Sequence, residues 1–296
     1  MLHVIVTADD FGLDTTINEA VEQAYNGGVL TAASLMVGQP AAGDAIERAR
    51  RLPGLRVGLH VTLTGGARPV LAPQQIPDLV DAKGRLPADL ATFGWRLATS
   101  ASVRRQAEEE IRAQFRAFAD TGLALDHANG HQHYHLHPFV LDRILKIGRG
   151  FGLRAVRVPF EPLWLARQVS AVAPRAGRLS ALGWELGARW MRRRLRREHF
   201  ACNDYLFGLR CTGRLDEAAL CEALEKLRPG IAEVYLHPAT RSGVREQSAG
   251  VGAHATEEFD ALMSLPARQR LQALRASVGG FADIPDEALE LQGVAA

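Results

Sequence analysis

Short apolar runs alternate along this chain with segments whose apolar residues recur every three to four positions. This alternation predicts βα units around a parallel sheet. The expected strands are residues 2–7, 30–37, 56–61, 123–126, 154–158, 231–236 and 276–281. The expected helices are residues 15–26, 41–51, 103–120, 138–149, 215–227 and 256–275. We see no internal repeat and no linker, so residues 1–296 are expected to form one α/β domain, for which a (β/α) barrel is an ordinary size.

Two segments interrupt the pattern. Residues 64–98 contain Pro and Gly and are weakly periodic, which is typical of an active-site loop, a lid or a substrate wall. Residues 161–200 combine tryptophans with clustered arginines and are interpreted as an insertion or an interfacial segment. Its 184–197 part suggests a peripheral membrane contact. A solvated basic helix with packed tryptophans is the alternative.

Charge and cysteine content narrow the function classes. A formal net charge of +2 gives no argument for nucleic-acid binding. Three cysteines form no even-numbered framework, which favours a reducing compartment. The chain shows no signal-peptide pattern and no apolar run of about 20 residues. We therefore expect a cytoplasmic protein, with a peripheral contact to the inner membrane as an option; the sequence leaves the oligomeric state open.

Polar residues stand at the ends of several expected strands. Asp9 and Asp10 follow the first strand, His60 ends the third, five histidines lie within 127–137, and His237 follows 231–236. In a βα barrel all strand C-termini open onto one face, so these residues are expected to converge. Two adjacent carboxylates repel each other, and a divalent metal or a shared proton relieves that repulsion.

This residue set has the composition of a hydrolytic metal site. Such a site uses three protein ligands and keeps one position open for water. A further carboxylate beside the water acts as general base, and a histidine protonates the leaving group. Structural alternatives exist: the Asp pair can cap the following helix, and His60 can be a hydrogen-bonded core residue. The alternating histidines at 131–137 are too polar for a purely structural role.

Five motifs carry a resemblance to a known family. They are TADDFG at 7–12, GLH at 58–60, HxHxHxHP at 131–138, RVP at 157–159 and LHP at 236–238. Together they resemble the YdjC-like carbohydrate deacetylases, over residues 2 to about 240. The resemblance implies a distorted TIM-like barrel and removal of N-acetyl groups from chito-oligosaccharides.

A closer similarity is to the hopanoid-biosynthesis-associated branch of this family. It rests on NGHQHYHLHP at 129–138, RVPFEP at 157–162 and NDYLFG at 203–208. The implied substrate is an N-acetylglucosaminyl hopanoid. The alternatives are a chito-oligosaccharide deacetylase, a metal-dependent phosphoesterase, and a metal- or glycan-binding protein without turnover. A phosphoesterase would favour two metals, whereas we see ligands for one.

The family resemblance also implies residue roles. Asp9 would be the general base, and His237 the acid that protonates the departing amine. The metal would be held by Asp10, His60 and His131. The stretch before the last ligand reads Asn129-Gly130 where the family has Asp-Ser, and this departure leaves His127, preceded by Asp126, as a rival ligand.

Two more residues are expected near the substrate. The identity of the metal ion is not decided by the sequence. Arg157 and His133 are predicted to contact the N-acetylated glycan or glycolipid. Arg157 could instead pair with a site carboxylate such as Asp9 or form an ordinary salt bridge. The cofactor is expected to be one divalent ion, Zn or Mg, since two imidazoles and a carboxylate do not decide between them.

Overall fold

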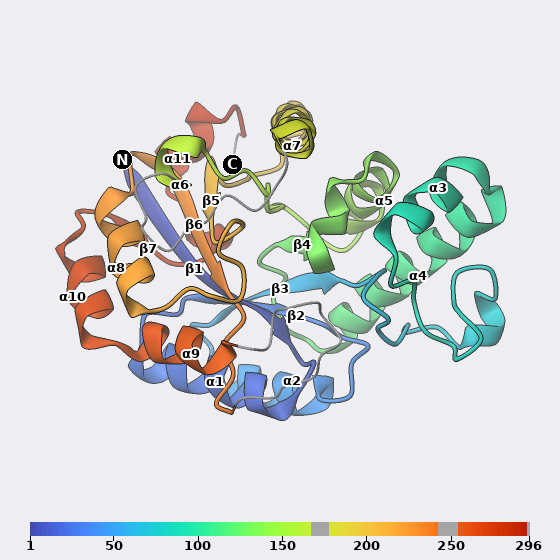
Figure 1. Cartoon of the computed structure of the whole chain (residues 1–296), viewed down its shortest axis with the longest axis horizontal. Coiled ribbons are helices and arrows are strands. Elements are labelled where there is room, and N and C mark those ends of the chain that lie inside the picture. Colours follow the sequence, from blue (N-terminus) through green and yellow to red (C-terminus); the bar gives the residue numbers. More distant parts are fainter. Residues whose placement is uncertain (167–177, 242–253, 295–296) are drawn as a thin grey trace.

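A computed structural model describes residues 1–166, 178–241 and 254–294 (Figure 1). Its described strands form one seven-stranded sheet in the order β4-β3-β2-β1-β6-β5, with β7 also paired to β1. The strands are β1 (Leu2–Phe11), β2 (Ala32–Leu35), β3 (Arg56–Val61), β4 (Ala128–Gly130), β5 (Tyr205–Phe207), β6 (Gly230–Leu236) and β7 (Ser277–Val278). Every pairing is parallel, as the βα pattern predicts.

The sheet curls into the expected distorted barrel. Its outer strands, β4 and β5, are connected through the segment that was predicted as strand 154–158. There, isolated bridges join Ala128 to Val156 and Ala155 to Ala201, just before β5. The predicted strand is therefore reduced to single bridges, and the barrel is irregular on this side.

Helices cover the outside of the sheet. They are α1 (Thr15–Gly27), α2 (Ala42–Arg51), α3 (Leu90–Thr99), α4 (Ala101–Asp120), α5 (Pro138–Arg149), α6 (Leu163–Ala166), α7 (Arg178–Arg197), α8 (Glu217–Lys226), α9 (Ala255–Met263), α10 (Leu265–Ala273) and α11 (Asp286–Leu291). Asp14 caps α1 by accepting a hydrogen bond from the Thr16 backbone. Among the described residues, no helix is both long and apolar enough to cross a membrane.

Several predicted boundaries are wrong for local reasons. The expected strand 123–126 lies too early, because the residues that pair with β3 are Ala128–Gly130. The expected helix 256–275 is two helices, since Ser264 caps α10 and Pro266 occupies its first turn. The expected strand 276–281 is only Ser277–Val278. The short strand β5 and the helix α11 were not predicted.

Residues 64–98 are more ordered than the predicted loop. They contain α3 and a 3₁₀ turn at Pro73–Gln75. The segment is fastened to α4, where the Glu110 carboxylate accepts hydrogen bonds from the backbones of Val70 and Leu71. Its start reaches His131 at Gly65, and its later part contacts Tyr134 through the Leu90 carbonyl and the Phe93 ring.

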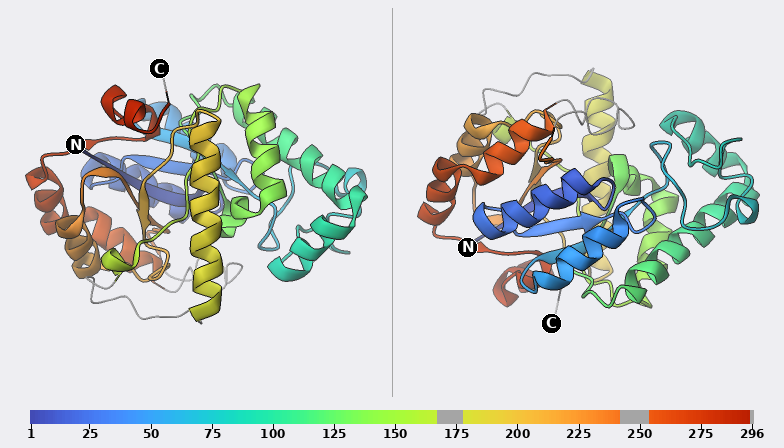
Figure 2. Two further views of the ribbon diagram at one scale, coloured as in Figure 1. Left: turned by 90° about the horizontal axis from the view of Figure 1, so that it is seen from above. Right: turned by 90° about the horizontal axis from the view of Figure 1, so that it is seen from below.

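Residues 161–200 form α6 and α7, apart from 167–177, which lie outside the described residues. Ala188, Met191 and Leu195 are the buried side of α7. This side packs toward the turn that follows β4, and the rest of the helix lies along the outside of the molecule (Figure 2).

The C-terminal segment closes the N-terminal end of the barrel. His3 on β1 contacts the Ser277 hydroxyl through Nδ1 at 2.8 Å and the Gly280 carbonyl through Nε2 at 2.9 Å. Asp126 accepts hydrogen bonds from the backbones of Phe281 and Ala282. These contacts fix residues 277–282 against β1 and the segment leading to β4.

Candidate metal centre and active site

A bulge in β1 directs both aspartates to the same place. Ala8 pairs with Ala33 and Phe11 with Leu35, so β1 carries one residue more than β2 between these points. The bulge includes Asp10 at a φ of 62°, in the left-handed region. Side chains of a regular strand alternate between faces, but the extra residue re-aims one of them. Asp9 and Asp10 are both buried, with exposures of 1% and 3%.

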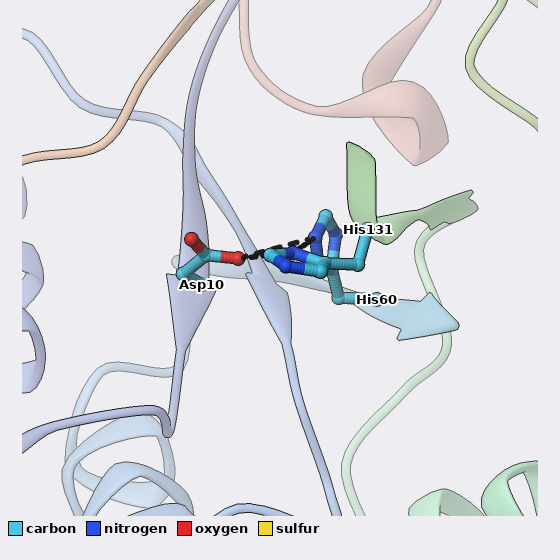
Figure 3. Close-up of side chains that lie close together, drawn as sticks. All are labelled: Asp10, His60 and His131. Carbon is cyan, nitrogen blue, oxygen red and sulfur yellow. Dashed lines mark hydrogen bonds and ion pairs between the residues drawn. The ribbon is translucent and has the colours of Figure 1, made fainter. Parts of the chain in front are cut away.

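Asp10, His60 and His131 converge from three neighbouring parts of the sheet (Figure 3). The Asp10 Oδ1 atom lies 3.0 Å from His131 Nδ1 and 3.3 Å from His60 Nε2. The two ring nitrogens are 3.4 Å apart. Among the described residues, this is the group of buried ligand atoms that could hold a metal ion. One carboxylate oxygen and two imidazole nitrogens fit the donor set of a three-ligand site.

The charges of these residues are coupled. Burial disfavours the charged forms of both Asp10 and His131. The two histidines nevertheless hold the pKa of Asp10 well below its usual range, and Asp10 raises the pKa of His131. The carboxylate is therefore ionised and available as a ligand.

Gly65 leaves the space that His131 occupies. A Cβ at this position would lie 2.7 Å from His131 Nε2, and the backbone φ of +76° favours glycine as well. The start of the 64–98 segment thus forms one wall of the triad.

Asn129 fixes the orientation of His60. Its Oδ1 lies 2.7 Å from His60 Nδ1, so that nitrogen donates and Nε2 is left facing Asp10. The amide nitrogen donates to Ser34 at 2.8 Å and to Asp9 at 3.3 Å. In the sequence, Asn129 stands out only as a departure from the family motif, and its place two residues before His131 is the signal that could have indicated this role.

We expect Asn129→Leu to weaken metal binding about 10- to 100-fold, the usual cost of losing a partner that orients a metal ligand. Leucine keeps the side-chain volume but cannot accept the His60 proton. Titration of the apoprotein with Zn²⁺ would measure the affinity. Ser34→Ala removes the outer contact of Asn129 and the contact between Ser34 and His127, but it leaves the Asn129–His60 hydrogen bond in place, so it is the matched control. It should bind metal more tightly than Asn129→Leu; equal affinities in wild type and Asn129→Leu would contradict the assigned role.

Arg157 lies beneath Asp9. Its guanidinium contacts Asp9 Oδ2 at 2.5 Å and Glu233 Oε1 at 2.8 Å, and Glu233 Oε1 also accepts a hydrogen bond from the Thr7 hydroxyl. Burial would raise the pKa of Asp9, but Arg157 and nearby His60 and His237 hold it below its usual range. The pairing with Asp9, which the sequence left as an alternative, is present in the structure. The contact of Arg157 with the sugar stays a prediction, and the side chain of Arg157 is fully buried.

The histidines at 131–137 do not share a strand face. His131, His133 and His135 lie in a 3₁₀ turn, His131–Leu136, with positive φ at Gln132 and His133, and His137 follows the turn. Its side chains therefore point in different directions. The His135 ring contacts the Arg157 carbonyl at 3.0 Å and is fully buried, which lowers its pKa to about 3. This residue supports Arg157 through one ring nitrogen, and its Nδ1 is buried without a hydrogen-bond partner among the described residues.

His133 lies on an aromatic wall. Its Nε2 contacts the Tyr235 hydroxyl at 3.0 Å, and that hydroxyl also contacts Thr212 at 2.7 Å. The Trp184 ring on α7 stands edge-on to His133 at 6.1 Å, and Trp184 is 38% exposed. Burial and the neighbouring His135 hold the pKa of His133 well below its usual range. A half-buried neutral imidazole beside an exposed indole suits contact with a sugar.

His237 follows β6 on the far side of Tyr235, with the two rings 5.4 Å apart. Its backbone is held by Glu258, which accepts a hydrogen bond from the His237 N–H at 2.5 Å. The Nδ1 atom is buried and has no hydrogen-bond partner among the described residues. A buried polar atom without a partner is costly in a finished core, so this nitrogen is suited to a reacting group.

His127 is excluded as the rival ligand by its partners. Its Nδ1 contacts Asp126 at 2.8 Å and its Nε2 contacts the Ser34 hydroxyl at 3.2 Å. Both ring nitrogens are thereby occupied within the fully buried interior of the sheet. His131 is the histidine that joins Asp10 and His60.

A parallel barrel with a carboxylate–imidazole triad at one rim defines the class of fold and site. The chain belongs to the family of YdjC-like proteins, whose model matches residues 3–273. The resemblance stated from the motifs is thus confirmed at the family level.

Named relatives agree with this membership. The chain is 37% identical over 164 residues to a carbohydrate deacetylase of Brevibacillus brevis, covering 55% of this chain and 60% of the relative. It is 35% identical over 166 residues to a carbohydrate deacetylase of Geobacillus stearothermophilus, covering 56% and 61%. The match therefore spans less than two thirds of these relatives. A carbohydrate deacetylase of Vibrio cholerae serotype O1 is 27% identical over 274 residues, 92% of each chain.

A solved structure supports the fold. It is that of a protein of Enterococcus faecalis V583 named for cellobiose-phosphate cleavage, with a TM-score of 0.72 and 20% identity. The similarity covers 95% of this chain and 98% of that one.

Proposed function

We propose that this protein is a metal-dependent carbohydrate deacetylase, which hydrolyses the N-acetyl group of an amino sugar. The observation that carries the proposal is the convergence of Asp10, His60 and His131 beside a second buried carboxylate, Asp9. The names of the relatives support the same activity.

The three ligands would hold one divalent ion. Bound there, such an ion would lower the pKa of a coordinated water toward ~7 and polarise the acetamide carbonyl. Two imidazoles among three ligands favour Zn²⁺ over Mg²⁺, which prefers oxygen ligands. Metal analysis of the purified protein would decide the identity.

Asp9 is suited to accept a proton from the attacking water. Arg157 keeps it ionised and holds its Oδ2, which leaves Oδ1 on the side of Asn129. Because this ion pair also weakens Asp9 as a base, we expect the proton to stay on Asp9 only briefly. His237, with its unpartnered Nδ1, would donate a proton to the departing amine, and acetate would leave.

We further propose that the acetylated sugar is an N-acetylglucosaminyl hopanoid. The branch motifs at 129–138, 157–162 and 203–208 support this substrate. His133, Tyr235 and Trp184 would form the wall against which the sugar lies. The single ligand group among the described residues does not favour a phosphoesterase, which would use two metals.

Mass spectrometry of acetyl loss tests the proposed function. The purified protein is incubated with an N-acetylglucosaminyl hopanoid or with diacetylchitobiose, each with and without a chelator. We expect the hopanoid to lose one acetyl group, and the chelator to abolish this loss because the ligand triad would be emptied. Loss from chitobiose alone would keep the chemistry and contradict the lipid substrate. No loss from either, with metal bound, would contradict the deacetylase proposal.

A further inference from the structure

The outer side of α7 carries exposed apolar side chains. Leu182, Leu186 and Trp190 are 55%, 57% and 40% exposed. They follow one another at intervals of four residues, so they form one stripe along the helix. The stripe lies opposite the buried residues Ala188, Met191 and Leu195. Large apolar residues aligned on an outer face mark a surface that another apolar phase covers.

An arginine groove adjoins this stripe. It is a cavity of about 280 Å³, lined by Phe160, Arg189, Arg192, Arg193 and Arg196. No acidic side chain is among these lining residues. The Arg192 guanidinium stands 4.8 Å from the centre of the Phe160 ring.

The positive charge in the groove is only partly compensated. Arg196 pairs with Asp204 and Arg189 with Glu185, each at 2.5 Å. The Arg196 Nε is nevertheless buried without a hydrogen-bond partner among the described residues. Burial and the neighbouring Arg196 lower the pKa of Arg192. A cavity lined by four guanidinium groups and no carboxylate fits an anionic group of phosphate size.

The arginines near the end of α7 differ in what they contact. Arg194 is bound to Asp142 at 2.7 Å and to Glu198 at 2.8 Å, so it fastens α7 to the body of the protein. Arg193 and Arg197 are exposed and continue the apolar stripe toward the end of the helix. The outward side of α7 is thus apolar in its first half and cationic in its second.

We propose that α7 docks this protein on an anionic lipid surface. Leu182, Leu186 and Trp190 would enter the boundary between headgroups and acyl chains, as in other interfacial helices. The arginine groove would take a phosphate headgroup, and Arg193 and Arg197 would add attraction to the charged surface. Charge complementarity selects anionic lipid as the partner over a neutral surface.

Docking in this orientation brings the candidate site close to the lipid surface, behind α7. Trp184, on the same helix, stands 6.1 Å from His133 on the aromatic wall. From Trp184 to Trp190 the helix advances about 9 Å at 1.5 Å per residue. Trp184 lies on the inner side of the docked helix, so the site is about one helix diameter from the lipid surface, where a sugar carried by a membrane lipid would reach it. Only this last step rests on the proposed function; the docking surface does not.

Vesicle flotation tests the docking. Wild-type protein is mixed with vesicles of phosphatidylcholine alone, or of phosphatidylcholine with phosphatidylglycerol, at low and high salt. We expect flotation only with the anionic vesicles, and less of it at high salt because exposed charges are screened. Arg189→Gln with Arg193→Gln should reduce the partition coefficient about 25-fold, about fivefold for each arginine. Leu182→Ser with Leu186→Ser should reduce it as well.

The matched control is Arg112→Gln with Arg116→Gln, the same charge change on exposed positions of α4, which should float like wild type. Equal loss in this control, or no flotation of wild type, would overturn the proposal. Binding of inorganic phosphate in calorimetry without flotation would assign the groove to a soluble anion and overturn it too. Acetyl release from a detergent-dispersed substrate separates the two proposals, since the α7 variants should retain it.

Discussion

Asp9→Asn is expected to lower the rate of acetyl release about 10²- to 10⁴-fold, the range for loss of a general base. The substituted amide cannot accept the proton of the attacking water. Asp10, His60 and His131 are unchanged, so the variant should still bind one metal ion per chain. Release of acetate under saturating substrate, together with metal analysis of the same sample, would measure both properties.

Asp10→Asn is the matched comparison, because it distinguishes loss of a metal ligand from loss of the general base. Asparagine tolerates the left-handed backbone at this position, so the fold should be retained. This variant should lose metal affinity together with activity. If Asp9→Asn lost metal to the same degree, or kept the wild-type rate, the division of roles between the two aspartates would be contradicted.

Arg157→Met is expected to destabilise the fold by about 3–5 kcal/mol, the cost of leaving buried charges without a partner. Asp9 and Glu233 both lie in the interior, and Arg157 is the cation that contacts them. Methionine fills much of the volume but compensates neither carboxylate. Urea unfolding of wild type and variant would measure the difference. Arg210→Met is a suitable control, because its partner Glu161 is contacted at the longer distance of 3.6 Å.

The loss of unfolding free energy in Arg157→Met should change with pH in a defined direction. In wild type the pKa of Asp9 lies below that of the unfolded chain, so its ion pair contributes stability above pH ~4 that is lost as the pH falls further. Without Arg157, burial would raise the pKa of Asp9 in the folded state. The variant would then gain stability on acidification, and its deficit should be larger at pH 8 than at pH 5. A deficit independent of pH would indicate lost packing and contradict the electrostatic explanation.

Apolar periodicity predicted the main strands of this fold because β1, β3 and β6 are buried on both faces. Their apolar runs were placed at 2–7, 56–61 and 231–236, and the structure has them at Leu2–Phe11, Arg56–Val61 and Gly230–Leu236. β4 was misplaced because its residues, Ala128–Gly130, include a polar side chain that faces the site rather than the core. A strand this short, with a polar residue at its centre, has no apolar run by which it could be predicted.

The ligand triad was predicted from family motifs, but its geometry was not. The two aspartates face one site only because β1 has a bulge, and a bulge has no signal in the alternation of residues. The histidines at 131–137 alternate with other residues, but this alternation did not predict their conformation: positive φ values at Gln132 and His133 make the stretch a turn. Backbone irregularities of this kind depend on contacts distant in sequence.

The roles of Arg157 and His127 were decided by partners that the sequence does not place. Glu233 lies within the apolar run of β6 and was not predicted to have a role. In the structure Arg157 forms ion pairs with both Glu233 and Asp9. His127 was a candidate ligand by its position in the sequence. In the structure its Nε2 contacts the Ser34 hydroxyl on β2, so it does not face Asp10. Long-range pairing between strands determines both outcomes.

The contacts of Asp126 connect the C-terminal segment of the chain to the candidate metal centre. A continuous series of hydrogen bonds runs from the backbone of Phe281 through Asp126, His127, Ser34 and Asn129 to His60. The family match stops at residue 273, before the first member of this series. A domain boundary drawn by sequence similarity would therefore cut away the far support of a metal ligand. Residues 281 and 282 therefore belong to the support of the candidate metal centre, and shortened versions of the protein need to retain them.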